Sequence, residues 1–118
     1  MRDFRRLDVW ERGHLLTLAV YRATAGFPAT EIYGLTAQMR RSASAVPTNI
    51  AEGCGRDGDA ELKRFMLIAM GSASEPEYQV QLATELGFLP VNDGTALASD
   101  VVEVKRMLSS FIVKLRPT

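Results

Sequence analysis

The last quarter of the chain carries the pattern that most constrains its fold, a regular repeat of apolar residues. Apolar side chains recur there at alternating steps of four and three residues: Leu97, Val101, Val104, Leu108, Phe111 and Leu115. In an α-helix this spacing forms one continuous stripe, which is typical of the seam between packed antiparallel helices. The pattern therefore predicts a helix over about residues 95–115 that buries its stripe against other helices.

Three earlier segments show the same helical periodicity, at about residues 8–25, 30–54 and 58–87. Segments rich in Gly and Pro separate them, and no strand-like alternation of polar and apolar residues appears. A chain of 118 residues is long enough for one domain with its own core. We therefore expect a single all-α domain over residues 1–118, an antiparallel up-and-down four-helix bundle.

Residue types at the ends of these segments predict the caps. We expect Ser, Thr, Asp or Asn at helix starts and Gly at helix ends, with Gly53 or Gly55 in the left-handed conformation. The expected starts are Asp8, Thr30 and Asp57 or Asp59, and the expected ends are Gly26, Gly53 or Gly55, and Gly87. Residues 90–94 are expected to form a turn before the last helix.

Two prolines interrupt the helical pattern. Pro47 lies inside the second helix, so a kink or break is expected near residues 43–47. Asn49 or Glu52, in the segment that ends at Gly53, is expected to satisfy the backbone groups that the proline leaves free. In the third helix Gly71 and Pro76 cost roughly 1 and 3 kcal/mol of helix stability. Either a kink there or close packing against Gly71 would offset this cost.

Apolar residues also occupy second faces of the first and third helices. They are Leu15, Leu18, Leu67 and Tyr78. A single bundle buries one face of each helix, so we expect these residues to lie in the interface of a homo-oligomer.

The residues needed for catalysis or metal binding are scarce. The chain has one His and one Cys, which cannot form a zinc site of the usual kind or a pair of Glu-x-x-His iron motifs. We expect His14 at the surface or an interface, and Cys54 as a small residue in a tight turn, with an oxidation-sensitive thiol as the alternative. No enzymatic activity, metal or cofactor is expected. No apolar stretch reaches membrane-span length, so we expect a cytoplasmic protein.

The charges balance in number but not in position. The chain has fourteen Lys and Arg and fourteen Asp and Glu. Residues 1–56 nevertheless carry a net charge of +3, and residues 57–118 carry a net charge of −3. One interpretation is pairing between the two halves, within or between subunits. The other is a local nucleic-acid patch, for which the candidates are Arg2, Arg5 and Arg6 in the N-terminal arm and Arg40 and Arg41 in the second helix. Arg40 and Arg41 are also candidates for ion pairs, and the arm for a frayed terminus.

Several short motifs together resemble a known family. They are Phe4-x-x-Leu7-x-Val9-Trp10, Tyr21, Phe27-Pro28-x-x-Glu31-x-Tyr33-Gly34-Leu35, Gln38-Met39-Arg40-Arg41, Ser44-x-Val46-Pro47-x-Asn49-Ile50-Ala51-Glu52-Gly53 and Ile68-Ala69-x-Gly71-Ser72. In this order they resemble the bacterial four-helix bundle proteins encoded within intervening sequences of 23S ribosomal RNA genes, the S23 family. The chain departs from the family pattern at Pro76.

The resemblance implies a non-enzymatic bundle that assembles as a homopentamer. A related protein of diversity-generating retroelements is a basic pentameric barrel that binds reverse transcriptase and nucleic acid, whereas this chain is neutral overall. By this likeness we expect a scaffold or adaptor that associates with RNA or with a nucleic-acid-processing protein. The alternative is a protein–protein interaction module without nucleic-acid binding.

Overall fold

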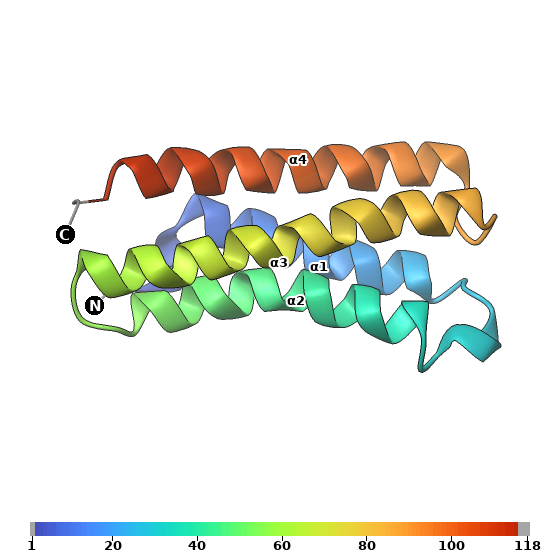
Figure 1. Ribbon diagram of the computed structural model, residues 1–118, viewed down its shortest axis with the longest axis horizontal. Helices are drawn as coiled ribbons and strands as arrows, with labels where there is room; N and C mark the ends of the chain where they lie inside the picture. The colour runs from blue at the N-terminus through green and yellow to red at the C-terminus, as the bar shows by residue number, and fades with distance from the viewer. Residues whose placement is uncertain (1, 116–118) are drawn as a thin grey trace.

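Four α-helices make up most of residues 2–115, the part of the chain that the computed structural model describes (Figure 1). They are α1 (Asp8–Thr24), α2 (Leu35–Cys54), α3 (Asp59–Glu85) and α4 (Val91–Val113). Two short 3-10 helices, η1 (Phe4–Arg6) and η2 (Ala29–Glu31), precede α1 and α2. No strand occurs within residues 2–115, so the predicted all-helical fold with four helices is confirmed.

The helices lie side by side along a body of 45 × 23 × 21 Å. α1 packs on α2 and α4, and α3 packs on the same two helices, whereas the backbones of α1 and α3 lie diagonally and do not approach closely. The chain reverses direction at each connection (Figure 1). We call the end with η1 and the α2–α3 connection the proximal end, and the end with η2 and the α3–α4 connection the distal end.

The core is built from one stripe of each helix. Most of the predicted last stripe is buried: Leu97, Val101, Val104 and Leu108 in α4, and Leu115 just beyond it. Phe111, the remaining member, is half-buried against this core. At the distal end the rings of Phe27 and Phe88 meet with centroids 5.7 Å apart, which links the two connections. None of the helices in the described part of the chain combines the length and the apolarity that a membrane span requires.

Two helices begin elsewhere than expected. α2 begins at Leu35, because residues 29–31 form η2 and Glu31 Oε1 accepts a hydrogen bond of 3.0 Å from the Leu35 amide. Gly34 is the N-cap position of α2, and the Glu31 side chain bonds the first helical amide; Thr30 as the start of α2 was wrong. α4 begins at Val91, directly after Pro90, so the expected turn over residues 90–94 is helical. Gly94 belongs to the α3–α4 contact, because a Cβ there would collide with Thr84 Oγ1.

Other caps also differ from those expected. α1 begins at Asp8 and α3 begins at Asp59, as expected, but both are first helical residues. The N-cap positions are Leu7 and Gly58, and Gly58 has φ of +84°. Gly87 is confirmed: its φ is +79°, and the Gly87 and Phe88 amides donate to carbonyls of the last turn of α3.

The glycines at the end of α2 are not left-handed. Gly55 has φ of −82°, and Gly53 lies inside the helix. A Cβ at Gly53 would approach Phe65 Cβ to 2.8 Å, so this glycine permits close packing of α2 on α3.

Pro47 does not break α2, and Pro76 does not break α3; each proline is buried inside a continuous helix. The carbonyl that Pro47 leaves free belongs to Ala43, and Thr17 Oγ1 of α1 donates to it at 3.2 Å. Asn49 instead donates to the Ala45 carbonyl at 2.7 Å. Glu52 forms an ion pair with Arg56. The expectation that Asn49 or Glu52 satisfies the freed carbonyl was therefore wrong, because the donor comes from another helix.

Candidate nucleic-acid interface

The fold separates the predicted basic residues into two groups. The Arg2 amide donates to the Cys54 carbonyl at 2.9 Å, which fixes the N-terminal arm at the proximal end. Arg40 and Arg41 lie in the other half of α2. Fourteen residues separate Arg40 from Cys54, about 21 Å at 1.5 Å per residue. The arm and the arginine pair therefore form two distinct surfaces.

The arm holds most of its charge in ion pairs. Arg2 lies 3.7 Å from Asp59, and Arg5 lies 3.6 Å from Asp3. Arg6 is exposed and, with Lys114, lines an open groove of about 340 Å³ between the arm and α4. Within residues 2–115 Arg6 forms no ion pair, so it is the one arm arginine whose charge is not offset by a carboxylate.

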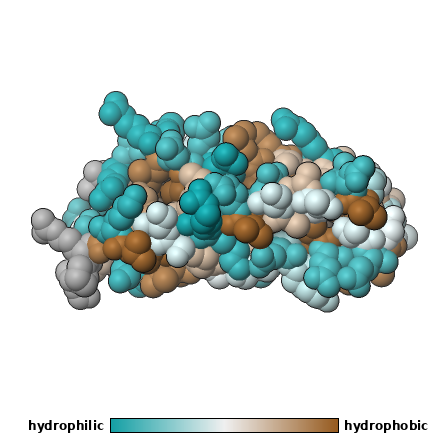
Figure 2. Space-filling model, turned by 90° about the horizontal axis from the view of Figure 1, so that it is seen from above, coloured by the Kyte–Doolittle hydropathy of each residue, from teal (hydrophilic) through white to brown (hydrophobic). Residues whose placement is uncertain are grey.

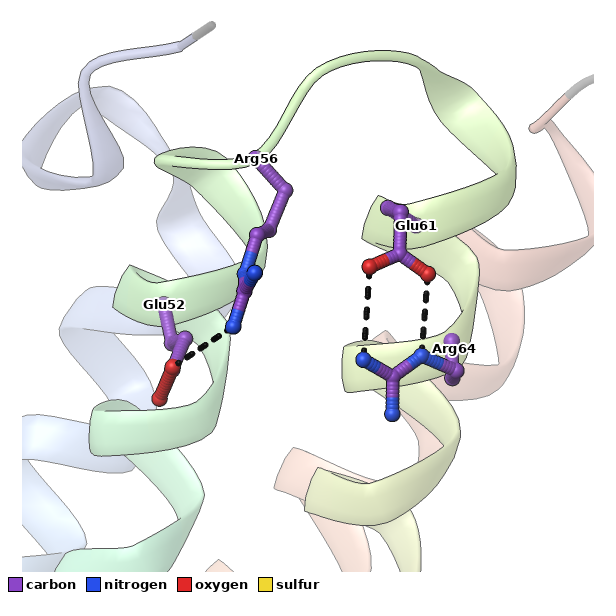
Figure 3. Close-up of polar contacts among 4 residues, drawn as sticks. All are labelled: Glu52, Arg56, Glu61 and Arg64. Atoms are coloured by element: carbon purple, nitrogen blue, oxygen red, sulfur yellow. Dashed lines mark hydrogen bonds and ion pairs between the residues drawn. The ribbon is translucent and has the colours of Figure 1, made fainter.

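The neighbouring arginines at the proximal end are also paired, as Figure 3 shows. Arg56 reaches back to Glu52 at 3.4 Å, and Arg64 forms two hydrogen bonds with Glu61, at 2.9 and 3.3 Å. The hydrogen bond from Arg64 lowers the pKa of the Glu61 carboxyl. Both guanidinium groups also lie over the Phe65 ring. Acids and bases at this end therefore largely offset each other.

Among the described residues, in contrast, Arg40 is held only by neutral groups. Its Nε donates to Thr24 Oγ1 at 2.9 Å, its Nη2 donates to the Tyr21 carbonyl at 3.4 Å, and its guanidinium lies 4.7 Å from the centre of the Tyr21 ring. These contacts orient the guanidinium without cancelling its charge. The expected ion pair of Arg40 is not found within residues 2–115.

Arg41 extends this surface outward. It is exposed, and within the described residues it has no carboxylate partner. Adjacent helical residues point about 100° apart, so Arg40 faces α1 while Arg41 faces away from the bundle. We call Tyr21, Arg40 and Arg41 the arginine–tyrosine patch. Its aromatic member, which is 45% exposed, was absent from the residues that sequence reasoning proposed for binding.

The tyrosine carried only a weak signal in the sequence. Tyr21 is one of the residues on which the family resemblance rests, but its contact with Arg40 spans nineteen residues and two helices. A second tyrosine, Tyr33, lies just before α2 and is 94% exposed. An aromatic side chain so exposed to solvent adds stacking surface at the distal end.

Similarity to known proteins identifies the family of this chain. The family model described as "23S rRNA-intervening sequence protein" matches residues 5–110. The chain belongs to this family. The resemblance drawn from the sequence motifs is thereby confirmed.

A solved relative of this family has the same fold. The crystal structure of a protein of unknown function from the S23 ribosomal protein family of Bacteroides thetaiotaomicron superposes with a TM-score of 0.79. It is 20% identical and covers 88% of this chain and 97% of its own. A comparison with curated proteins found no match.

In this family member few ion pairs join the two charged halves of the sequence, although their helices pack on each other. Of the ion pairs among the described residues, only Arg2–Asp59 joins residues 1–56 to residues 57–118. Pairing between the halves within one protomer is therefore limited to the proximal end. This leaves the arginines of the distal half of α2 unneutralised.

The four interface candidates lie on diagonal helices. Leu15 of α1 is 49% exposed, and Leu67 and Tyr78 of α3 are 52% and 61% exposed, while Leu18 is half-buried. On the α4 side, Figure 2 shows brown apolar patches interrupted by teal polar side chains. Among the exposed apolar residues of α4 are Val102 and Val113. Leu15, Leu67 and Tyr78 thus leave apolar surface exposed on α1 and α3, as α4 does at its own exposed residues.

The remaining reactive side chains are engaged in packing. His14 stacks on Trp10 with ring centroids 5.1 Å apart. Cys54 is the last residue of α2 and is 1% exposed, so its expected place in a tight turn was wrong. No cluster of three His, Cys, Asp or Glu suited to a metal ion occurs in residues 2–115.

Proposed function

We propose that this protein is a non-enzymatic homo-oligomeric scaffold that associates with RNA through the arginine–tyrosine patch. In this proposal antiparallel up-and-down bundles assemble as a homopentamer. The family description, which names 23S rRNA intervening sequences, supports a connection to RNA. The observation that carries the proposal is Arg40, oriented on Tyr21 and Thr24 with no carboxylate to offset its charge.

The patch has the chemistry that RNA recognition uses. A guanidinium presents planar donors that match phosphate oxygens, and it loses less freedom on binding when it is already oriented. Tyr21 supplies an aromatic face on which an unpaired base can stack, next to the Arg40 cation. Arg41 adds a second exposed charge one residue away. Together these side chains suit a single-stranded or looped RNA segment.

Assembly would multiply this weak site. One protomer has zero net charge, so a single patch supplies few phosphate contacts. A ring would present one patch per subunit at fixed spacing, and several patches on one RNA would bind much more tightly than one. The homo-oligomer therefore explains how a neutral chain would retain RNA.

The proposal includes no catalysis and a cytoplasmic location. The one cysteine is buried at the end of α2, and the one histidine is stacked on Trp10. A nucleophile needs a base within hydrogen-bond reach and access to substrate. These two side chains do not meet those needs.

The test is RNA affinity as a function of salt. A fluorescently labelled RNA with single-stranded loops is titrated with the protein at several salt concentrations, and binding is followed by anisotropy. We expect log K to fall linearly with log salt concentration. Arg41→Ala should lower affinity and reduce the slope by about one. Arg5→Ala, which removes an arginine paired with Asp3, is the matched control and should change little.

Absence of salt-sensitive binding at low ionic strength would end the RNA proposal. The alternative would then be a protein–protein interaction module, favoured by the exposed apolar residues at the distal end. These residues are Ile32, Tyr33, Leu86 and Val91. In that case Arg40→Ala and Arg41→Ala would alter assembly and leave RNA retention unchanged.

A further inference from the structure

Gly71 lies in the middle of α3, where nothing in its own protomer requires a glycine. It is exposed, its φ is not positive, and a Cβ built on it would meet nothing within 4 Å. Glycine in an exposed helix interior destabilises the helix relative to alanine. The close packing expected at Gly71 is therefore absent within the protomer, and a close approach from outside would explain the residue.

Gly71 belongs to a stripe along the outer face of α3. Residues at steps of three and four share this face: Leu67, Gly71, Glu75, Tyr78, Leu82 and Glu85. We call them the α3 stripe. Leu67 and Tyr78 expose large apolar surfaces on either side of the small residue, while Glu75 and Glu85 make the stripe acidic. The complementary surface for an apolar and acidic face is apolar and basic.

The outer surface of α1 has that composition. Leu15 and Leu18 lie between Arg12 and Arg22, and we call these four residues the α1 stripe. Both arginines are exposed, and neither forms an ion pair within residues 2–115. On the other stripe Glu75 has no hydrogen-bonding partner among the described residues, and Glu85 accepts only from Gln81, at 3.0 Å. Arg12 shares a groove with Glu103 of α4, which offsets part of its charge. Arg22 and Glu75 have no such partner among the described residues.

The two stripes also match in register. Thr17 donates to Ala43 and Gln79 accepts from Ser42, so Thr17 and Gln79 lie at the same level of the bundle. α1 and α3 run in the same direction (Figure 1). On α1, Arg12 lies five residues before Thr17 and Arg22 lies five residues after it. On α3, Glu75 lies four residues before Gln79 and Glu85 lies six residues after it. The two arginines are therefore ten residues apart, and so are the two glutamates.

We propose that the α1 stripe of one copy packs in parallel on the α3 stripe of the next copy. Arg12 would pair with Glu75, Arg22 with Glu85, and the leucines would cover Tyr78, while Gly71 would let the first turn of α1 approach closely. In a closed ring, neighbouring copies are not shifted relative to each other along the ring axis. If the long axis of each bundle is parallel to the ring axis, residues at the same level of neighbouring bundles therefore meet. Because the stripes lie on diagonal helices, each copy would use one stripe for each neighbour. This inference rests on the proposed homo-oligomer.

The test is the solution mass of charge-reversal variants by light scattering, with circular dichroism to confirm that each variant folds. Arg12→Glu with Arg22→Glu, or Glu75→Arg with Glu85→Arg, should weaken assembly by about a hundredfold or more, because like charges would face each other. Combining all four changes should restore the mass. Gly71→Arg should also dissociate the oligomer without unfolding the protomer, and Lys114→Glu, at an exposed position outside both stripes, is the control.

The possible results separate the two proposals. If the wild type is oligomeric and the reversed pairs keep its mass, the interface proposed here is wrong and the homo-oligomer stands. A wild type that is monomeric at high concentration would overturn both. Loss of mass in each double variant and recovery in the fourfold variant would establish the contact between the stripes.

Discussion

The hydroxyl of Thr17 on α1 donates to the carbonyl of Ala43 on α2 at 3.2 Å, and this is the carbonyl that Pro47 cannot bond within its own helix. The single hydrogen of this hydroxyl is shared with the Gly13 carbonyl, the nearer acceptor at 2.8 Å. A Cβ at Gly13 would approach Val46 Cγ1 to 3.2 Å, so this glycine permits close packing of α1 on α2 beside the proline. α1 thus supplies a donor for the carbonyl that Pro47 leaves free.

Thr17→Val should destabilise the protein by about 1–3 kcal/mol, because it leaves a part-buried carbonyl without its donor. Urea unfolding followed by circular dichroism measures the change. Thr95→Val is the matched control, since that hydroxyl bonds only to the Val91 carbonyl at an exposed position. Equal losses in the two variants would contradict this role of Thr17.

The double variant Thr17→Val with Pro47→Ala tests the same contact from the other side. Alanine at position 47 restores an amide that can donate to the Ala43 carbonyl. The cost of Thr17→Val should therefore be smaller in the Pro47→Ala background than in the wild type, in the same urea experiment. Strictly additive effects would argue against the shared carbonyl.

Ser42 and Gln79 form a second buried polar contact, 2.7 Å from Ser42 Oγ to Gln79 Oε1. Ser42→Ala should cost about 1–3 kcal/mol because the Gln79 oxygen then stays buried without a donor. Adding Gln79→Leu should recover part of that loss by removing the unpaired amide. A double variant less stable than Ser42→Ala alone, in thermal unfolding, would contradict this explanation.

Gly53→Ala should destabilise the protein by about 1–3 kcal/mol, because its Cβ would approach Phe65 Cβ to 2.8 Å between two rigid backbones. Two residues later, Gly55→Ala meets only the Glu52 carbonyl at 3.5 Å, an ordinary contact. Thermal unfolding of the two variants should separate them clearly. Similar melting temperatures would mean that α2 and α3 can move apart at little cost.

Cys54 should react slowly with thiol reagents in the folded protein. Burial raises the pKa of this thiol, so less thiolate is present at neutral pH. Because the folded state holds the proton more tightly than the unfolded state, this group's contribution to stability is lost as the pH rises through the thiol range. Reaction with Ellman's reagent at pH 8, with and without denaturant, checks the prediction; equal rates would show that the thiol is accessible.

The sequence predicted the four helices because their apolar stripes repeat with a local period. It misplaced the start of α2, since the side chain that bonds the first helical amide is Glu31, in a 3-10 turn, and not the better capping type, Thr30. It also misplaced the start of α4, because Gly94 suggested a turn where it serves packing against Thr84. Each error arose where a contact between elements outweighed a local preference.

The candidate site was also predicted only in part from the sequence. Arg40 and Arg41 stood out as adjacent cations, but the groups that orient Arg40 are Tyr21 and Thr24 on another helix. Such a contact has no local signature in the chain. The arm arginines also stood out, yet acids nearby in space offset Arg2 and Arg5. Sequence reasoning identified the charges, and the fold determined which of them are offset.

Both proposals depend on the homo-oligomer, and native mass spectrometry of the purified chain tests it most directly. The account predicts an assembly of five times 13.0 kDa, with subunits of unmodified mass on dissociation. A single species of 13.0 kDa that persists as the protein concentration is raised would contradict it.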